Sequence, residues 1–383
     1  MKFKASELWD AISENDVFAV KFPDGRIGYC IVMGMYEMHR SIAVYIGDEG
    51  ISSLWQVMQY PGEGDYSPDS SFLLHSADCL QCELLPLYEL SDQEARQPVR
   101  YLESIGETLT PSVIVPNLCS YRPRRLPYPV SRQEEEDLCF ALSAALYASQ
   151  HLEMFHSRRE YFPWNEEIPL LSKNGRTWQV GTTYLPMYDE FAYLEPKLPD
   201  AALIDYINRQ KTAVFMTLDV SLTILKAQIV KNPDSKDPAP VFAVALLAMD
   251  ENYVLQPSIS PAMTDEQIDE MLSTFAEVIA DLPEKPGRIR VNGTFAYVFL
   301  EEFCAVTGIE LVYDPSIPRL EELTDNLNRT LDEPDEEFNR LMDLIARSPD
   351  ADEIMHTLDQ AVQDGEAFQY IDKLKERFLK SEK

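Results

Sequence analysis

Long hydrophobic runs are missing from this sequence of 383 residues. The longest, over residues 241–249, has the length of a β-strand and is too short to span a bilayer. The amino-terminal stretch MKFKASELWDAI lacks the apolar core and the small-residue cleavage site of a signal peptide. We therefore expect a cytoplasmic protein that does not contact a membrane.

Basic residues are scarce, because 33 Lys and Arg stand against 65 Asp and Glu, giving a formal net charge of −32. Such a surface repels phosphates, so neither nucleic acid nor an anionic membrane is an expected partner. The one basic concentration is YRPRRLPYPVSR, which contains Arg122, Arg124, Arg125 and Arg132. Its prolines favour extended backbone, and we interpret it as a solvated linker, with an anion site as the alternative.

Cysteine is infrequent as well, with six residues scattered along the chain. A chain of this length can bury its own apolar core without disulfides, so we expect reduced, mostly buried thiols. His75, Cys79 and Cys82 in HSADCLQC invite a zinc interpretation. Structural zinc needs a fourth ligand, and two cysteines three apart in a strand point to opposite faces. We favour thiols packed in a core, and we predict no cofactor.

The composition that is present, 45% hydrophobic and 10% aromatic, indicates a globular protein of two or three domains. Strand-like segments alternate with turn-forming residues over residues 1–130, which predicts a small α+β domain. Its strands are expected at residues 16–22, 26–33, 41–46 and 79–85, with shorter ones near 72–74 and 113–115. A helix is expected over residues 51–59.

Residues 131–200 are predicted to form a helical and aromatic connector between domains. Ser131 stands three residues before Glu134, the spacing of a capping box that opens a helix. Apolar residues then share one helical face: Leu138, Ala141, Leu142, Ala145 and Leu152. Further on, Asn174 and Gly175 predict the turn of a β-hairpin.

Residues 201–318 predict a sheet of mixed direction with helices packed on it. The expected order is three strands, a helix, a strand, a helix and a strand. Thr264 and Gln267 form a second capping box, and Gly308 closes the later helix. Residues 319–383 are expected to form an acidic helical tail that folds back or serves as an association surface.

Several segments of the first domain resemble the amino-terminal domain of a family of bacterial proteins with domains of unknown function. In order, these segments are DVFAVKFPDGRIGYCIVMG, AVYIGDEG, DCLQCELL and SYRPRRLPYPV. VFAVALLAMDENYVL, RIRVN and GIELVYD look like the companion domain that often follows. The resemblance implies a bacterial cytoplasmic protein of two domains with no assigned activity. The element order of residues 201–318 is also similar to that of the ribonuclease H-like fold, which includes nucleases and transposases.

Active members of that fold hold two divalent cations between converging carboxylates. Asp219 lies in the first strand, where the fold places its first acid. Asn292 stands at the end of the fourth strand, where a second acid belongs, and its amide adds no negative charge. Glu302, or its neighbour Glu301, is the candidate third ligand on the next helix. Because the set is incomplete, we favour polar strand-end residues without catalysis.

The stretch AVYIGDEGISSLW predicts a strand that turns into a helix, an arrangement that often binds phosphate. Asp48 and Glu49 occupy the position of the phosphate. Their carboxylates can accept the free helix N–H groups and repel another anion, so we expect capping instead. The sequence contains no nucleophile elbow, dinucleotide fingerprint or phosphate-loop lysine motif.

These observations predict a noncatalytic protein that binds a protein or a small ligand. The first alternative is a divalent-metal-dependent nuclease or phosphodiesterase that uses Asp219, Asn292 and Glu302. The second is an assembly or regulatory subunit that acts through its carboxy-terminal helices. A protein partner or a second copy of the chain is expected in either binding role.

Overall fold

The computed structural model describes residues 8–34, 40–59, 68–90, 92–106, 108–110, 112–155, 160–188, 192–225, 241–250, 253–254, 258–324 and 373. The chain divides into two compact units. Unit 1 comprises Met1–Pro61, Leu73–Phe191 and Asp234–Ala239, and unit 2 comprises Gly62–Phe72, Ala192–Pro233 and Pro240–Lys383. Both contain helices and a mixed sheet, which confirms the predicted mixture of α and β structure.

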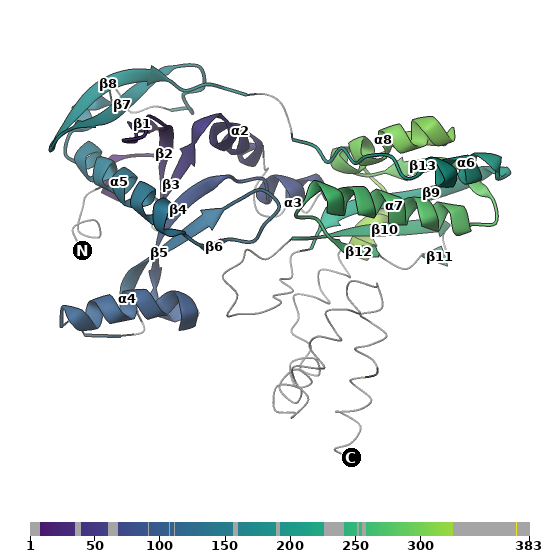
Figure 1. Ribbon diagram of the computed structural model, residues 1–383, viewed down its shortest axis with the longest axis horizontal. Helices are drawn as coiled ribbons and strands as arrows, with labels where there is room; N and C mark the ends of the chain where they lie inside the picture. Colours follow the sequence, from purple (N-terminus) through teal and green to yellow (C-terminus); the bar gives the residue numbers. More distant parts are fainter. Residues whose placement is uncertain are drawn as a thin grey trace, which may run out of the picture. The chain divides into compact units, whose positions relative to one another are not determined.

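Unit 1 is built on an eight-stranded sheet in the order β6-β5-β4-β3-β2-β1-β7-β8 (Figure 1). Its strands are β1 (Phe18–Lys21), β2 (Ile27–Met33), β3 (Ser41–Ile46), β4 (Cys79–Pro86), β5 (Ile114–Tyr121), β6 (Tyr128–Pro129), β7 (Glu167–Asn174) and β8 (Thr177–Tyr184). Neighbours pair antiparallel except β1 and β7, which are parallel. The chain therefore forms a meander from β1 through β6 and then returns to extend the sheet at β1 with β7 and β8.

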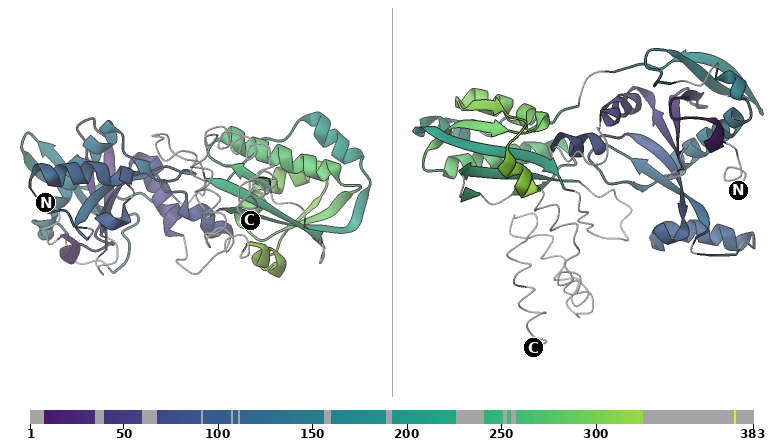
Figure 2. Two further views of the ribbon diagram at one scale, coloured as in Figure 1. Left: turned by 90° about the horizontal axis from the view of Figure 1, so that it is seen from below. Right: turned by 180° about the vertical axis from the view of Figure 1, so that it is seen from behind.

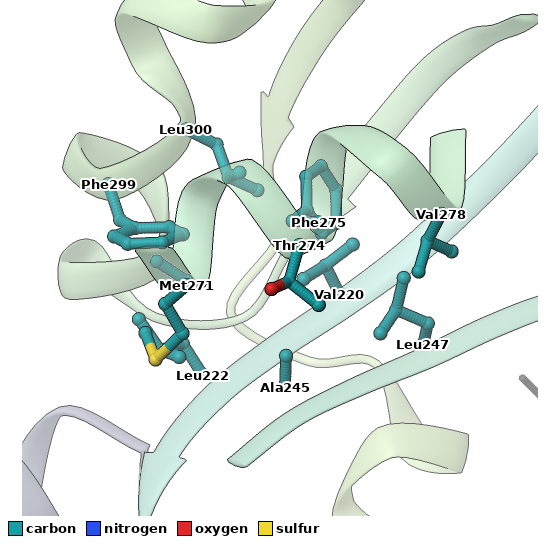
Figure 3. Close-up of a pocket in the computed structure, with 11 residues that line it drawn as sticks. Val220, Leu222, Ala245, Leu247, Met271, Thr274, Phe275, Val278, Phe299 and Leu300 are labelled. Atoms are coloured by element: carbon teal, nitrogen blue, oxygen red, sulfur yellow. The ribbon is translucent and has the colours of Figure 1, made fainter. Parts of the chain in front are cut away.

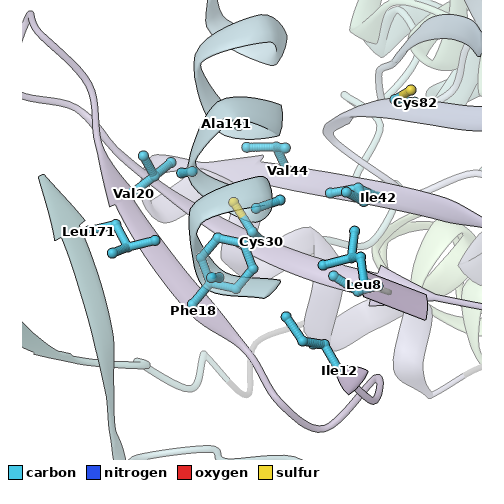
Figure 4. Close-up of a cluster of buried hydrophobic side chains, with 14 of the residues drawn as sticks. Leu8, Ile12, Phe18, Val20, Cys30, Ile42, Val44, Cys82, Ala141 and Leu171 are labelled. Carbon is cyan, nitrogen blue, oxygen red and sulfur yellow. The ribbon is translucent and has the colours of Figure 1, made fainter. Parts of the chain in front are cut away.

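Helices cover both faces of this sheet. The helical elements are α1 (Leu8–Ala11), α2 (Gly47–Met58), α4 (Asp92–Ser104), α5 (Arg132–Ser149) and the 3₁₀ turns Leu87–Glu89 and Leu152–Met154. Figure 4 shows α5 lying across the strands, with Ala141 near Val20 and Cys30. On the other face, Ile51 and Leu54 of α2 join a second buried cluster. A sheet buried on both faces explains the apolar character of β1 to β3.

The predicted connector of residues 131–200 is instead largely part of unit 1. The capping box of Ser131 and Glu134 is present, and α5 begins where expected. However, Leu138, Ala141 and Ala145 are fully buried in the core of the sheet. The expected hairpin forms β7 and β8, which add to the same sheet. The apolar face of α5 packs against the unit 1 sheet and is buried there.

Unit 2 is built on a second sheet, seen in two further views in Figure 2. Its strand order is β11-β10-β9-β13-β14, with β12 also paired to β10. Its strands are β9 (Thr212–Ile224), β10 (Phe242–Asp250), β11 (Tyr253–Val254), β12 (Ser258–Pro261), β13 (Lys285–Val291) and β14 (Glu310–Tyr313). Strand β10 runs antiparallel to β9, β11 and β12, whereas β9, β13 and β14 are parallel. The helices are α6 (Ala201–Arg209), α7 (Asp265–Asp281) and α8 (Thr294–Thr307).

The two faces of the unit 2 sheet are covered differently. Val220 and Leu222 face α7 and α8. On the opposite face, Val244 and Ala248 pack in a cluster with Leu320. Residues 318–324 are helical, so the first part of the predicted tail folds back onto the sheet. The rest of the predicted tail lies outside the described residues, apart from residue 373.

One short strand was predicted in error. Residues 72–74 belong to the helix α3 (Pro68–Leu74), with Asp69 in its first turn. Proline at the first helical position and an early acidic residue are start signals for a helix, and they precede the apolar residues that suggested a strand.

In the described part of the chain, every helix is too short or too polar to cross a bilayer.

Candidate active site of unit 2

Asp219, the first candidate metal ligand, is paired with Arg290 on the neighbouring strand β13. The guanidinium Nε lies 2.7 Å from Oδ1 of Asp219, and Nη2 lies 2.8 Å from Oδ2. A further contact joins Nη1 to Oδ2 of Asp314 at 3.3 Å. Hydrogen bonding to Asp219 raises the pKa of Arg290, while partial burial acts in the opposite direction. Both oxygens of the Asp219 carboxylate are thus engaged by a cation of the same chain.

Asp219 and Glu302 lie on opposite sides of the sheet. Side chains alternate along a strand, and the adjacent Val220 points toward α7 and α8. Asp219 therefore points to the other face, where its cross-strand neighbour Ala248 packs in a cluster with Leu320. Glu302 is exposed on α8, which lies on the helix-covered side. The carboxylates of these two residues do not converge on one position.

Asn292 is buried directly before α8, with an exposed fraction of 7%. Its Oδ1 has no hydrogen-bond partner among the residues that the structure describes. Within that same part of the chain, no three His, Cys, Asp or Glu side chains gather so as to hold a metal ion. A pair of Mg²⁺ ions needs several converging carboxylates, and the described arrangement does not provide them.

The amino-terminal end of α8 is occupied by Asp69 of α3. The N–H of Thr294 donates to Oδ2 of Asp69 at 2.8 Å, and the N–H of Phe295 donates to Oδ1 at 3.0 Å. Phe72 stacks on Phe295, with ring centroids 4.7 Å apart and an interplanar angle of 10°. A helix amino terminus that follows a strand is a common phosphate site. In unit 2 a carboxylate of the chain itself fills this position.

The zinc candidates of unit 1 are separated by the sheet. Cys79 packs in the cluster on the α2 face, whereas Cys82 packs in the cluster on the α5 face. Burial raises the pKa of both thiols to about 12, so neither is a ready thiolate ligand. His75 precedes β4, and its carbonyl oxygen accepts a hydrogen bond from the N–H of Arg124. All six cysteines are free thiols, and five of them are buried.

The strand-to-helix turn after β3 has no capping side chain at Ile46. Asp48 and Glu49 lie in the first turn of α2, where a carboxylate interacts favourably with the helix dipole. Asp48 also accepts a hydrogen bond from the hydroxyl of Tyr188, which raises the pKa of that tyrosine. The turn is narrow, because a Cβ at Gly50 would lie 2.9 Å from the carbonyl carbon of Tyr45.

The basic segment is tied into unit 1 rather than forming a solvated linker. Arg122 Nη1 lies 2.5 Å from Oδ1 of Asp78, and Nη2 lies 2.6 Å from Oε1 of Glu134. Burial acts to raise the pKa of Glu134, but hydrogen bonds from Ser131 and other donors outweigh it, so the pKa is lowered. Arg122 is therefore already partnered by two carboxylates, which leaves it unsuited to an anion site.

A small cavity of about 30 Å³ lies between the unit 2 sheet and the helices α7 and α8 (Figure 3). Its lining is apolar except for the hydroxyl of Thr274, and it consists of Val220, Leu222, Ala245, Leu247, Met271, Thr274, Phe275, Val278, Ala296, Phe299 and Leu300. About one methyl group or one water molecule fills such a space, and ligand pockets are roughly ten times larger. We interpret the cavity as a packing defect.

Comparison with known proteins identifies two domain families in the chain. Residues 1–168 match the domain of unknown function DUF7309, and residues 203–328 match the domain of unknown function DUF6930. No curated protein and no solved structure matches the chain. The first match includes α5, in agreement with the burial of that helix in unit 1. The chain therefore carries two domains to which no activity is assigned.

Proposed function

We propose that this protein of two domains of unknown function is noncatalytic and works by binding a protein or a small ligand. The observation that carries the proposal is the bidentate pair between Asp219 and Arg290. A divalent cation at Asp219 would have to displace the Arg290 guanidinium, which makes two short contacts with the carboxylate. Glu302 could not help to hold that cation, because it lies on the other side of the sheet. The six free cysteines support a reducing compartment such as the bacterial cytoplasm.

A metal-dependent nuclease or phosphodiesterase is the second candidate, and the strand order of unit 2 favours it. With β9 as the first strand, the order is third, second, first, fourth, fifth, and the second strand alone is antiparallel to the first. This order supports a ribonuclease H-like fold for unit 2. Because fold does not determine chemistry, the carboxylate geometry decides between the candidates.

Hydrolysis assays on the purified full chain test this choice. We expect Mg²⁺ or Mn²⁺ to give no cleavage of a phosphodiester, DNA or RNA above that of Asp219→Ala. A ligand that binds the folded state raises the melting temperature of a protein. Because we expect neither metal to bind, neither should raise the melting temperature of this chain. Metal-dependent cleavage that Asp219→Ala abolishes would establish the nuclease and overturn the noncatalytic proposal. Arg290→Met tests whether a latent metal site exists, because this substitution removes the guanidinium that pairs with the Asp219 carboxylate.

Assembly through the carboxy-terminal helices is tested by truncation. The cut belongs after Thr324 rather than after Tyr313, because Ile317 and Leu320 are buried in unit 2. If these helices mediate association, the truncated chain should lose oligomeric mass and retain its melting transition. An unchanged mass would exclude the helices as the association surface.

A further inference from the structure

The strands that end the two sheets differ in how they discourage pairing with another chain. β6 has two residues and ends at Pro129, and β11 also has two residues. β14 has four residues and carries Glu310, which is paired with Arg288. Short length, proline and charge are the usual protections of an edge strand. β8 ends the unit 1 sheet with eight residues, TWQVGTTY, which include neither a charge nor a proline.

The backbone of β8 offers unused pairing groups at this edge. A two-residue loop, Gly175 and Arg176, joins β7 to β8, and a positive φ occurs at Gly175 but not at Arg176. This is the type II′ pattern, in which the flanking pair Asn174 and Thr177 is hydrogen-bonded. Alternate residues along β8, starting at Trp178, therefore point their N–H and C=O groups away from β7. Among the described residues these groups have no backbone partner outside the sheet.

Two apolar side chains along this edge are exposed. Val180 is 49% exposed and Tyr184 is 62% exposed. Both lie on the face of the sheet that α5 covers, because they are two and six residues after Trp178 and so point to the same side of the strand. Trp178 packs against Phe140 of α5 at a centroid distance of 5.2 Å. The helix α5 thus protects the first residues of this row and leaves the later ones uncovered. A strand added beside β8 would cover them.

Charge favours a second copy of the chain as the added strand. The hairpin tip carries Lys173 and Arg176, whereas Glu166 and Glu167 lie at the opposite end, beside Tyr184. In an antiparallel pair of β8 strands, the basic tip of each copy lies at the same end of the interface as the acidic residues of the other, with Lys173 and the second copy's Glu167 three strand spacings, or about 14 Å, apart. β8 itself contributes no charge, so two copies of a chain with a net charge of −32 can approach here without like charges directly opposed.

We propose that two copies of this chain associate through β8, pairing antiparallel about a twofold axis at Gly181. This register keeps α5 of both copies on the same side of a continuous sheet. It places Trp178 opposite Tyr184 of the second copy and Val180 opposite Thr182. The proposal adds a partner to the binding role proposed above, but it stands whether or not unit 2 has an activity.

The molar mass of the full chain in solution tests the interface, measured across a dilution series by sedimentation. We expect twice the chain mass of 43.8 kDa. Val180→Lys places two like charges diagonally across the axis, about 7–8 Å apart, and should raise the dissociation constant by about tenfold or more. Val214→Lys is the matched control, because Val214 is 74% exposed on β9 of unit 2. It makes the same chemical change and should leave the dimer intact.

Cysteine substitutions in β8 test the register of the two paired strands. They are made in a Cys139→Ser background, which lacks the exposed thiol. At the axis, the two copies of residue 181 would have Cα atoms about 4.5 Å apart, within the range of a disulfide. Gly181→Cys should therefore form a covalent dimer on mild oxidation. Thr177→Cys is the control in the same strand, because its symmetry mate would lie about 26 Å away along the sheet.

The outcomes separate the two proposals. A wild-type monomer at all concentrations, or a dimer that Val214→Lys rather than Val180→Lys dissociates, overturns the β8 interface. Cross-linking through residue 177 in place of residue 181 overturns the antiparallel register. If Val180→Lys does not fold, the cysteine pair alone decides. Hydrolysis is measured on the same samples, so loss of the dimer proposal leaves the noncatalytic proposal intact, and the reverse also holds.

Discussion

Asp69 and Gly293 depend on each other, because a Cβ at position 293 would lie 2.8 Å from Oδ1 of Asp69. The Asp69 carboxylate can reach the amino terminus of α8 because residue 293 has no Cβ in its way. We predict that Asp69→Ala lowers the free energy of unfolding by about 1–2 kcal/mol, since two helix N–H groups lose their acceptor. Gly293→Ala should also destabilise the protein, because its methyl group displaces the cap. Urea unfolding measures both.

A double-mutant cycle provides the control for this prediction. In the Asp69→Ala background there is no carboxylate to displace, so Gly293→Ala should have a smaller effect than in the wild type. Additive effects of the two substitutions would show that the methyl group and the carboxylate do not compete for the same space.

The ion pair of Asp219 and Arg290 should contribute measurably to stability. Arg290→Met leaves the Asp219 carboxylate, which is 15% exposed, without its cation. We expect a loss of about 1–3 kcal/mol, less than for a fully buried pair. Arg288→Met on the same strand is the control, because Arg288 and Glu310 are both about half exposed and should contribute at most about 1 kcal/mol. Equal losses for the two variants would contradict the special role of Arg290.

The cavity under α7 and α8 should accept one more methyl group. We predict that Val220→Ile, at the cavity wall, raises the free energy of unfolding by up to about 1 kcal/mol. Val244→Ile is the matched control in the neighbouring strand, where Val244 is fully buried among Ile317 and Leu320. There the extra methyl group should overpack the core and destabilise it. Thermal unfolding of both variants distinguishes filling from crowding.

Buried thiols should make the protein less stable in alkali. Burial raises the pKa of Cys304 to about 12, whereas an unfolded thiol titrates near 9.0. Between these values the unfolded state releases a proton that the folded state keeps, so stability falls as pH rises from about 9 to about 12. We predict that Cys304 alone lowers the free energy of unfolding by about 1 kcal/mol between pH 8 and pH 10.

Substitution checks the thiol prediction. Cys304→Ala should reduce the decline in stability between pH 8 and pH 10, whatever its effect at neutral pH. Cys139→Ala is the comparison, because Cys139 is the exposed cysteine and should contribute less to the pH dependence. The prediction fails if the two variants decline equally.

Local signals predicted much of the fold. The capping boxes at Ser131 and Thr264 mark the starts of α5 and α7, and Gly308 ends α8 with a φ of +66°. β3 spans the six residues expected. These features depend on neighbours within a few positions, which a sequence displays directly.

Long-range contacts account for what the sequence did not reveal. The helix α5 was expected in a connector, because its pattern shows an apolar face but not the sheet that this face meets. Arg290 was not expected to neutralise Asp219, since their contact requires β13 to pair with β9. The cap of α8 by Asp69 joins residues far apart in the chain, and no spacing rule could indicate it. Alternation along the strand could have placed Asp219 on the face opposite Val220.

Phe72 and Asp69 come from the stretch of sequence that matches the first domain family, yet they complete the second unit. A gene segment encoding only residues 203–328 would contain every strand from β9 to β14. It would nonetheless leave α8 without its carboxylate and Phe295 without the rings of Phe72 and Tyr193. Recombination that moved this later segment alone into another gene would therefore separate α8 from the carboxylate that caps it.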